Sequence, residues 1–198
     1  FDHRLKTGNN LPLNDLLDAF GTYWDKTVYG SYSDKDEEEE SNNEINWEGR
    51  DPNKLKDEGI LLARIYREDV APGVKPLKVE AYNEKMLDES KSIKFIGYLD
   101  VEPADEIIDH KLKGKMISQS EADRDIQPLS YCLLTGKSNF AYHVAIKKIH
   151  PEIKIVQVRK TQLDVDWWVK NLKQIFAQMQ SGIAPGNPNQ WGCSKEYC

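Results

Sequence analysis

Two apolar segments joined by a short turn constrain the fold of this chain more than any other feature. Residues 93–102 and 106–112 are rich in Ile, Leu, Val and Phe, and Pro103-Ala104-Asp105 between them is typical of a tight turn. We therefore expect an antiparallel hairpin. Each strand carries a carboxylate inside its apolar run. Burying such a charge costs free energy unless it is paired or binds a metal ion.

The two-residue period of a strand predicts which of these side chains meet. Phe95, Gly97, Leu99 and Val101 should share one face of the first strand. Tyr98 and Asp100 should then share the other, and the hairpin would bring Asp100 beside Asp109 and Lys111. Two adjacent carboxylates repel each other, and a divalent cation with oxygen ligands removes that repulsion. Lys111 would then face a metal-bound water and the phosphate that it attacks. The alternative is a surface ion pair between Asp109 and Lys111.

The rest of the chain alternates between segments with the helical period of 3.6 residues and segments with the strand period of two residues. Helical spacing is found at 12–29, 52–69, 123–136 and 164–181, and strands are expected at 77–83, 93–102, 106–112, 140–149 and 153–161. This order predicts an α/β domain with a mixed central β-sheet flanked by helices. Gln127 and Tyr131 are four residues apart, so they share one face of the helix that follows the hairpin.

Three short motifs follow one another in a specific order. They are Gly97-x-x-Asp100, Ile107-Ile108-Asp109-His110-Lys111 and Gln127-x-x-x-Tyr131, preceded by Val79-Glu80 on the first expected strand. Together they resemble the RecB-like exonuclease branch of the PD-(D/E)XK nuclease superfamily, of phage and bacterial type. The resemblance covers about residues 50–198. It implies a restriction-endonuclease-like core and a nuclease that uses Mg²⁺ or Mn²⁺.

The resemblance also implies roles for individual residues. Asp100, Asp109 and the backbone carbonyl of His110 would bind the metal, and Lys111 would orient the attacking water and stabilise charge on the phosphate. Gln127 and Tyr131 would support the site and contact the DNA strand. Glu80 can join the metal ligands, and its alternatives are exposure to solvent or an ion pair with a lysine.

One element of the family pattern is absent. In such families a helix before the first strand often carries a further acidic or histidine ligand in a Gly-x-x-x-His pattern, and His3 lacks the preceding glycine. We therefore expect that the N-terminal helix with this ligand is missing from the sequence. We interpret residues 1–198 as one nuclease domain, with an acidic flexible loop at 30–46 and an irregular, cysteine-containing tail at 183–198.

The cysteines restrict the cellular setting and one further cofactor. Three cysteines in 198 residues are too few for a disulfide framework, which favours a reducing cytoplasm. In some relatives such a tail helps to hold an iron–sulfur cluster, for which Cys193 and Cys198 are the candidates here. The alternative is a tail with free cysteines packed by Trp191. Cys132 follows Tyr131 within a helix and is expected in the core.

Charge and hydropathy limit the classes of function. Residues 1–90 carry a net charge of −9 and residues 91–198 a net charge of +3, so bulk attraction to nucleic acid is excluded but a local basic groove is not. No apolar run is long enough to cross a bilayer, so no membrane partner is expected.

The favoured interpretation is a metal-dependent deoxyribonuclease that acts in recombination, repair or phage DNA processing. Its location would be the cytoplasm of a bacterium or a phage-infected cell, and a helicase or recombinase is a further partner that the resemblance suggests. The first alternative is a catalytically inactive nucleic-acid-binding domain of the same fold. The second is an interaction domain in which the two carboxylates are incidental.

Overall fold

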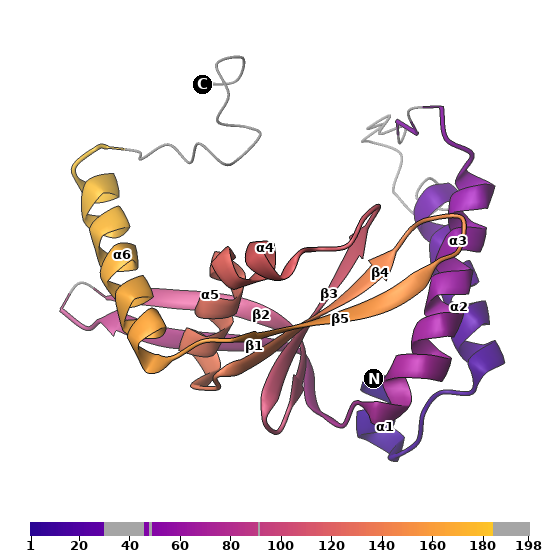
Figure 1. Cartoon of the computed structure of the whole chain (residues 1–198), viewed down its shortest axis with the longest axis horizontal. Helices are drawn as coiled ribbons and strands as arrows, with labels where there is room; N and C mark the ends of the chain where they lie inside the picture. Colours follow the sequence, from indigo (N-terminus) through magenta and orange to yellow (C-terminus); the bar gives the residue numbers. More distant parts are fainter. Residues whose placement is uncertain (30–45, 48, 91, 184–198) are drawn as a thin grey trace, which may run out of the picture.

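A computed structural model describes residues 1–29, 46–47, 49–90 and 92–183 (Figure 1). Most of the expected acidic loop at 30–46 lies outside these residues, as do Cys193, Cys198 and all of the expected tail except Ile183. No helix in the described ranges is long and apolar enough to cross a membrane.

The expected mixed sheet is confirmed. It contains five strands, which are β1 (Pro76–Asp88), β2 (Ile93–Pro103), β3 (Glu106–Lys113), β4 (Asn139–Ile146) and β5 (Glu152–Arg159). They lie in the order β1-β2-β3-β4-β5; β3 and β4 are parallel and the other neighbours antiparallel. A parallel pair needs a crossover connection, and the helical segment between β3 and β4 provides it.

One group of helices stands at one end of the long axis of the molecule, and a second group lies over the strands and reaches the other end (Figure 1). The first group contains α1 (Asp2–Thr7), α2 (Leu13–Tyr29), α3 (Pro52–Ile65), the π-helical turn η1 (Tyr66–Val70) and the 3₁₀ turn η2 (Ala71–Gly73). The second group contains α4 (Gln119–Arg124), α5 (Ile126–Thr135) and α6 (Gln162–Gln180). Helix α5 packs on β1, β2 and β4, while α3 contacts β5.

The helix expected at 123–136 is confirmed as α5, but its expected start is wrong, because residues 123 and 124 belong to the separate helix α4. Ser118 starts α4 with a capping box, and Asp125 adopts an extended conformation that ends α4 and caps α5. Pro128 explains the break, since a continuous helix would need the N–H that proline lacks and would push its ring against residue 124. As a result, α5 begins at Ile126 with Pro128 in its first turn, where proline is tolerated.

Strands β2 and β3 are paired beside the turn that joins them and diverge beyond it. We call the space between the diverging strands the fork. Val101 pairs with Ile108, which is the one paired position along these strands. Beyond it, β2 leaves β3 and continues along β1. The β1–β2 register continues there, with Val79 paired to Val101 and Ala81 to Leu99, but the backbone of Glu80 between them is distorted, with a left-handed φ of 47°.

This distortion changes the face on which β2 presents its side chains. Leu99 packs with Ile107 and Cys132 in the core beside α5, whereas Val101 packs with Ile108 and Val74 in a separate core cluster. Residues two apart in a regular strand share a face, so the expectation that Leu99 and Val101 do so is wrong. Asp100 lies at the point of the change, at the mouth of the fork.

Candidate active site

The carboxylate of Asp100 on β2 bridges to β3 at the point where the two strands diverge. Its Oδ2 accepts a hydrogen bond of 2.8 Å from the backbone N–H of His110 on β3, in place of the strand partner that β2 no longer provides. Nδ1 of the His110 ring lies 3.6 Å from the same oxygen. Burial raises the pKa of Asp100, but hydrogen bonds from the ring and the backbone of His110 outweigh burial and hold that pKa below its ordinary value.

Asp109 lies deeper and has a less favourable environment. Its side chain is buried, Oδ1 accepts a 2.6 Å hydrogen bond from Nε2 of Gln127, and Nζ of Lys111 lies 2.8 Å from Oδ2. The ammonium group of Lys111 is thus the one protein partner of this buried oxygen among the described residues. Burial raises the pKa of Asp109, the nearby charge of Asp100 adds to this effect, and Lys111 only partly opposes it.

Lys111 extends from β3 on the same side as Asp109. Its side chain is 28% exposed, so the ammonium group reaches solvent while it contacts the buried carboxylate. Nζ also lies 5.7 Å from the centre of the Tyr142 ring, a distance at which the face of the ring attracts a cation. Tyr142 donates a 2.7 Å hydrogen bond to Asp125, which fixes the ring against the start of α5.

Helix α5 brings two expected residues to this cluster. Gln127 contacts Asp109 directly, and its Nε2 also lies 3.2 Å from the hydroxyl of Tyr131. Gly97 makes this approach of helix to strand feasible, because a Cβ at that position would lie 2.8 Å from Cδ1 of Leu134. The structure therefore brings Asp100, Asp109, Lys111, Gln127 and Tyr131 together, and the glycine of Gly97-x-x-Asp100 has a packing role.

The remaining expected residues have different surroundings. Glu80 lies opposite Asp100 in the β1–β2 register but is exposed, and none of the hydrogen bonds and ion pairs found in the described part of the chain involves it. The ring of His110 lies on the face of β3 opposite Asp109, where Nε2 is 2.8 Å from the hydroxyl of Tyr66. This arrangement agrees with the strand period expected for β3.

The residues present fit a divalent cation with hard oxygen ligands. Asp100 and Asp109 supply carboxylates at one end of the fork, and Lys111 is the one protein partner that the described residues give to the buried Oδ2 of Asp109. Within the described ranges no cluster of three or more His, Cys, Asp or Glu side chains is suited to a metal. Mg²⁺ is commonly held by one or two carboxylates and completes its shell with water and phosphate oxygens, so two carboxylates suffice.

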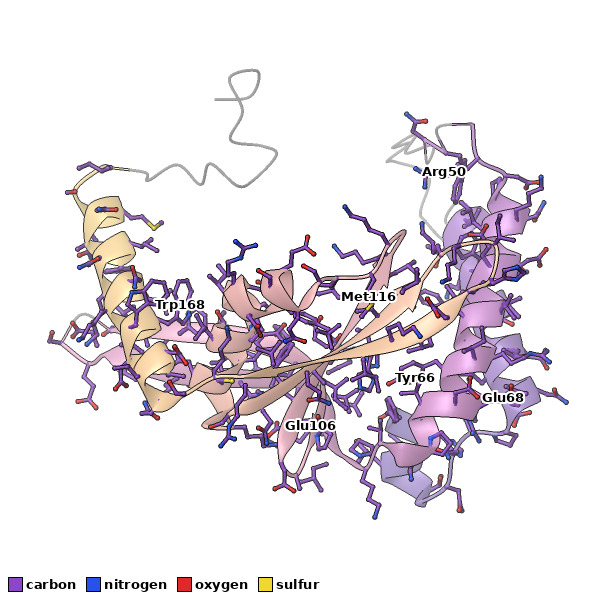
Figure 2. All side chains as sticks on the ribbon, viewed as in Figure 1. Arg50, Tyr66, Glu68, Glu106, Met116 and Trp168 are labelled. Carbon is purple, nitrogen blue, oxygen red and sulfur yellow. The ribbon has the colours of Figure 1, made fainter. Side chains whose placement is uncertain are left out.

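Sequence reasoning missed two residues next to this cluster. The hydroxyl of Tyr66 lies 2.8 Å from Nε2 of His110 and 2.8 Å from Nδ1 of His143, and it joins the two rings (Figure 2 shows Tyr66 between α3 and the strands). His143 pairs directly with His110 across the parallel strands β3 and β4. The sequence alone does not reveal that register. The one feature of the sequence that pointed to this side of the sheet is the strand period, which puts His110 on the face opposite Asp109.

Comparisons with known proteins identify the family and the fold. The family model of the PD-(D/E)XK nuclease superfamily matches residues 8–198. The crystal structure of a "putative exonuclease" from Eubacterium rectale is similar in fold, with a TM-score of 0.53 and 15% sequence identity over 96% of this chain and 74% of that chain. No curated protein sequence matches significantly.

Proposed function

The chain belongs to the PD-(D/E)XK nuclease superfamily, and we propose that it is a metal-dependent deoxyribonuclease that hydrolyses phosphodiester bonds. The observation that carries this proposal is the pair of carboxylates at the fork, with Lys111 2.8 Å from the buried and otherwise unpartnered oxygen of Asp109. A buried carboxylate whose pKa is raised by burial despite a lysine beside it is expected where a cation binds.

In this proposal Asp100, Asp109 and the carbonyl of His110 hold the cation. The N–H of His110 points across the fork to Asp100. The carbonyl of a strand residue points to the same side as its N–H, which supports this carbonyl as the third ligand. Glu80, opposite Asp100 in register, is a further candidate that would have to turn from solvent toward the fork.

Lys111, Gln127 and Tyr131 would then have different roles in hydrolysis. A bound Mg²⁺ or Mn²⁺ supplies a water of lowered pKa and positive charge beside the phosphate. Lys111 holds its ammonium group toward the same point, where it orients the water and stabilises the negative charge that develops on phosphate. Gln127 donates to Asp109 and so fixes the direction of the second carboxyl oxygen, while Tyr131 supports Gln127.

The motifs and the family support more specific proposals about the branch of the superfamily, the pathway and the partner. The order of Gly97-x-x-Asp100, the Asp109-to-Lys111 motif and Gln127-x-x-x-Tyr131 supports the RecB-like branch, and with it a role in DNA recombination, repair or phage DNA processing in a bacterial cytoplasm. The similarity in fold to the exonuclease structure from Eubacterium rectale supports an exonuclease over an endonuclease. A helicase or recombinase partner is proposed on the same family grounds.

One observation favours a second function, a catalytically inactive DNA-binding domain. Within the described residues no third His, Cys, Asp or Glu joins Asp100 and Asp109 in a metal-binding cluster. Such a domain would bind DNA but would not cleave it at any concentration of metal.

Incubation with linear and with closed circular DNA in Mg²⁺ separates these functions. An exonuclease degrades only the linear form, and an endonuclease also converts the circle. If both substrates stay intact in Mg²⁺ and in Mn²⁺ while DNA binding persists, the inactive domain is correct and the nuclease proposal is wrong.

A further inference from the structure

Tyr66 connects the proposed metal centre to a histidine that no motif includes. Its hydroxyl is 2.8 Å from Nε2 of His110 and 2.8 Å from Nδ1 of His143, and Nδ1 of His110 in turn faces Asp100. The four side chains therefore form one continuous chain from the carboxylate to the buried ring of His143.

The carboxylate of Asp100 sets the direction of the hydrogen bonds along this chain. An anion favours an N–H over a lone pair, so Nδ1 of His110 carries the proton that faces Asp100. Nε2 of His110 then accepts from the Tyr66 hydroxyl, and the Tyr66 oxygen accepts from Nδ1–H of His143. Burial lowers the pKa of His143 to about 4 and raises that of Tyr66, so both are neutral and each donates one hydrogen bond.

The His110 ring is only partly enclosed, with Phe1 stacked on it at a ring-centroid distance of 6.3 Å and the edge-on ring of His143 at 5.7 Å. A half-open cavity of about 740 Å³ lies between α2, α3 and the sheet, and Tyr66, His110 and His143 all line it. The His110 side chain is 36% exposed. Ring contacts do not distinguish a nitrogen edge from a carbon edge, so the hydrogen bond from Tyr66 is a contact that selects which ring atom faces inward.

A change of helix type places Tyr66 opposite the sheet. Helix α3 ends at Ile65, and Tyr66 opens a π-helical turn, a rare conformation that is frequent at functional sites. The regular α-helix therefore gives way to the wider turn at the residue that must reach two histidines on the sheet.

We propose that Tyr66, supported by His143, is a positioning residue that holds the His110 ring against Asp100 and thereby sets the affinity of the fork for its cation. The inference rests on the proposed nuclease function, in which Asp100 is a metal ligand. Groups that orient a metal ligand typically change metal affinity or activity by about 10- to 100-fold when they are lost.

The test compares Tyr66→Phe with the wild-type chain by Mn²⁺ titration calorimetry and by single-turnover DNA cleavage at several Mn²⁺ concentrations. Tyr66→Phe keeps the ring and loses the hydroxyl. We expect Mn²⁺ to bind roughly 10- to 100-fold more weakly and cleavage to slow, with part of the rate restored by excess Mn²⁺. A variant that only weakens the fold, but is folded at the temperature of the titration, would bind Mn²⁺ with wild-type affinity. Tyr23→Phe, which alters an exposed tyrosine on α2, is the matched control and should behave as wild type.

Two variants of His143 provide a second route if Tyr66→Phe fails to fold. His143→Asn keeps an N–H donor near the position of Nδ1 and should retain Mn²⁺ affinity, whereas His143→Leu removes the donor and should lower it. Wild-type affinity and rate in Tyr66→Phe, or in His143→Leu where Tyr66→Phe does not fold, would overturn the inference. Absence of cleavage by the wild-type chain would instead overturn the nuclease function, and the calorimetry would still decide the role of Tyr66.

Discussion

Asp100 and Asp109 are neighbours at the fork, but their surroundings act on their charges in opposite directions. Asp100 is stabilised as an anion by the backbone and the ring of His110, which lower its pKa. Asp109 is destabilised as an anion because burial raises its pKa more than Lys111 lowers it. The stability of the metal-free protein should therefore respond differently to neutralisation of each residue.

We expect Asp109→Asn to raise the melting temperature at pH 7 in chelator and Asp100→Asn to lower it. A raised carboxyl pKa means that the folded protein favours the protonated form, so Asp109 favours folding at low pH and loses this effect as the pH rises through its pKa. A lowered pKa has the opposite effect, since the stability from Asp100 is present above the ordinary Asp pKa and is lost on acidification.

Melting curves from pH 3 to 8, with the ion removed, measure both effects. The advantage of Asp109→Asn should shrink as the pH falls through the raised pKa of Asp109 and should be gone below about 4, the ordinary pKa of Asp, whereas the deficit of Asp100→Asn should begin to shrink only below about 4. Equal shifts of the same sign at pH 7 would contradict the environments described for the two carboxylates.

Lys111 is the residue whose removal should affect the reaction most selectively. Lys111→Ala should reduce the single-turnover cleavage rate by about 100-fold or more while DNA binding is largely retained, because the ammonium group acts on charge that develops in the transition state. Lys85→Ala, an exposed lysine on β1, is the control. A normal rate in Lys111→Ala would reduce Lys111 to an ion-pair partner of Asp109.

At the scale of elements, helix α5 connects the sheet to the site. Asp125 caps its first turn and Gln127 in the same turn reaches Asp109 on β3, while Tyr131 follows one turn later. The break at Asp125 is therefore part of the site, since a continuous helix would give this turn a different position.

Gln127→Ala should slow cleavage by roughly 10- to 100-fold, because Asp109 loses a hydrogen-bond donor that sets its orientation. Gln127→Glu should be more severe, since it replaces the donor with a second anion beside a carboxylate whose pKa is already raised. Tyr131→Phe removes only the contact with Gln127 and should be the mildest. Single-turnover rates should follow that order, and a Gln127→Glu rate at or above that of Gln127→Ala would contradict it.

Local patterns predicted the elements and much of the cluster. Strand and helix periods identified β1 to β5, α2, α3 and α6, and the pairing of Asp100 with the Asp109 motif needed only a two-strand hairpin with a short turn. Gln127 was predicted because it follows the hairpin directly. The split between α4 and α5 was also readable, since Pro128 forbids a continuous helix there.

Non-local geometry explains what the sequence did not reveal. The face change at Asp100 depends on the backbone of Glu80, twenty positions earlier, and no motif encodes its left-handed conformation. The contact of Tyr66 with His143 depends on the parallel register of β3 and β4. Helix α1 lacks a strong pattern of its own and is held by Arg4, which donates to the carbonyls of Ala71 and Val74.

At the scale of the whole molecule, charge is divided along the chain. The first 90 residues carry a net charge of −9 and the remainder +3. Lys113 and Lys115 are exposed where β3 ends, two and four residues beyond Lys111. A polyanion should therefore approach the fork from the end of β3 and be kept away from the acidic first half.

Replacing Lys113 and Lys115 together by Glu should weaken DNA binding markedly and reduce its salt dependence, because fewer phosphates are neutralised. Lys170 and Lys173 on α6, changed to Glu in the same way, form a charge-matched control with a smaller expected effect. Deletion of residues 34–42, an acidic segment outside the described residues, should leave binding unchanged or improve it. Weaker binding after that deletion, together with no effect of the charge reversal, would place DNA elsewhere.

The most direct test of the account is the metal dependence of cleavage at this fork. Linear DNA is incubated with the wild-type chain in Mg²⁺, in Mn²⁺ and in excess chelator, beside Asp109→Asn purified in the same way. We predict cleavage in either ion, none in chelator, recovery when Mg²⁺ is restored in excess, and none by Asp109→Asn. Full cleavage in chelator, or equal cleavage by Asp109→Asn, would contradict the assignment of the reaction to Asp100, Asp109 and Lys111.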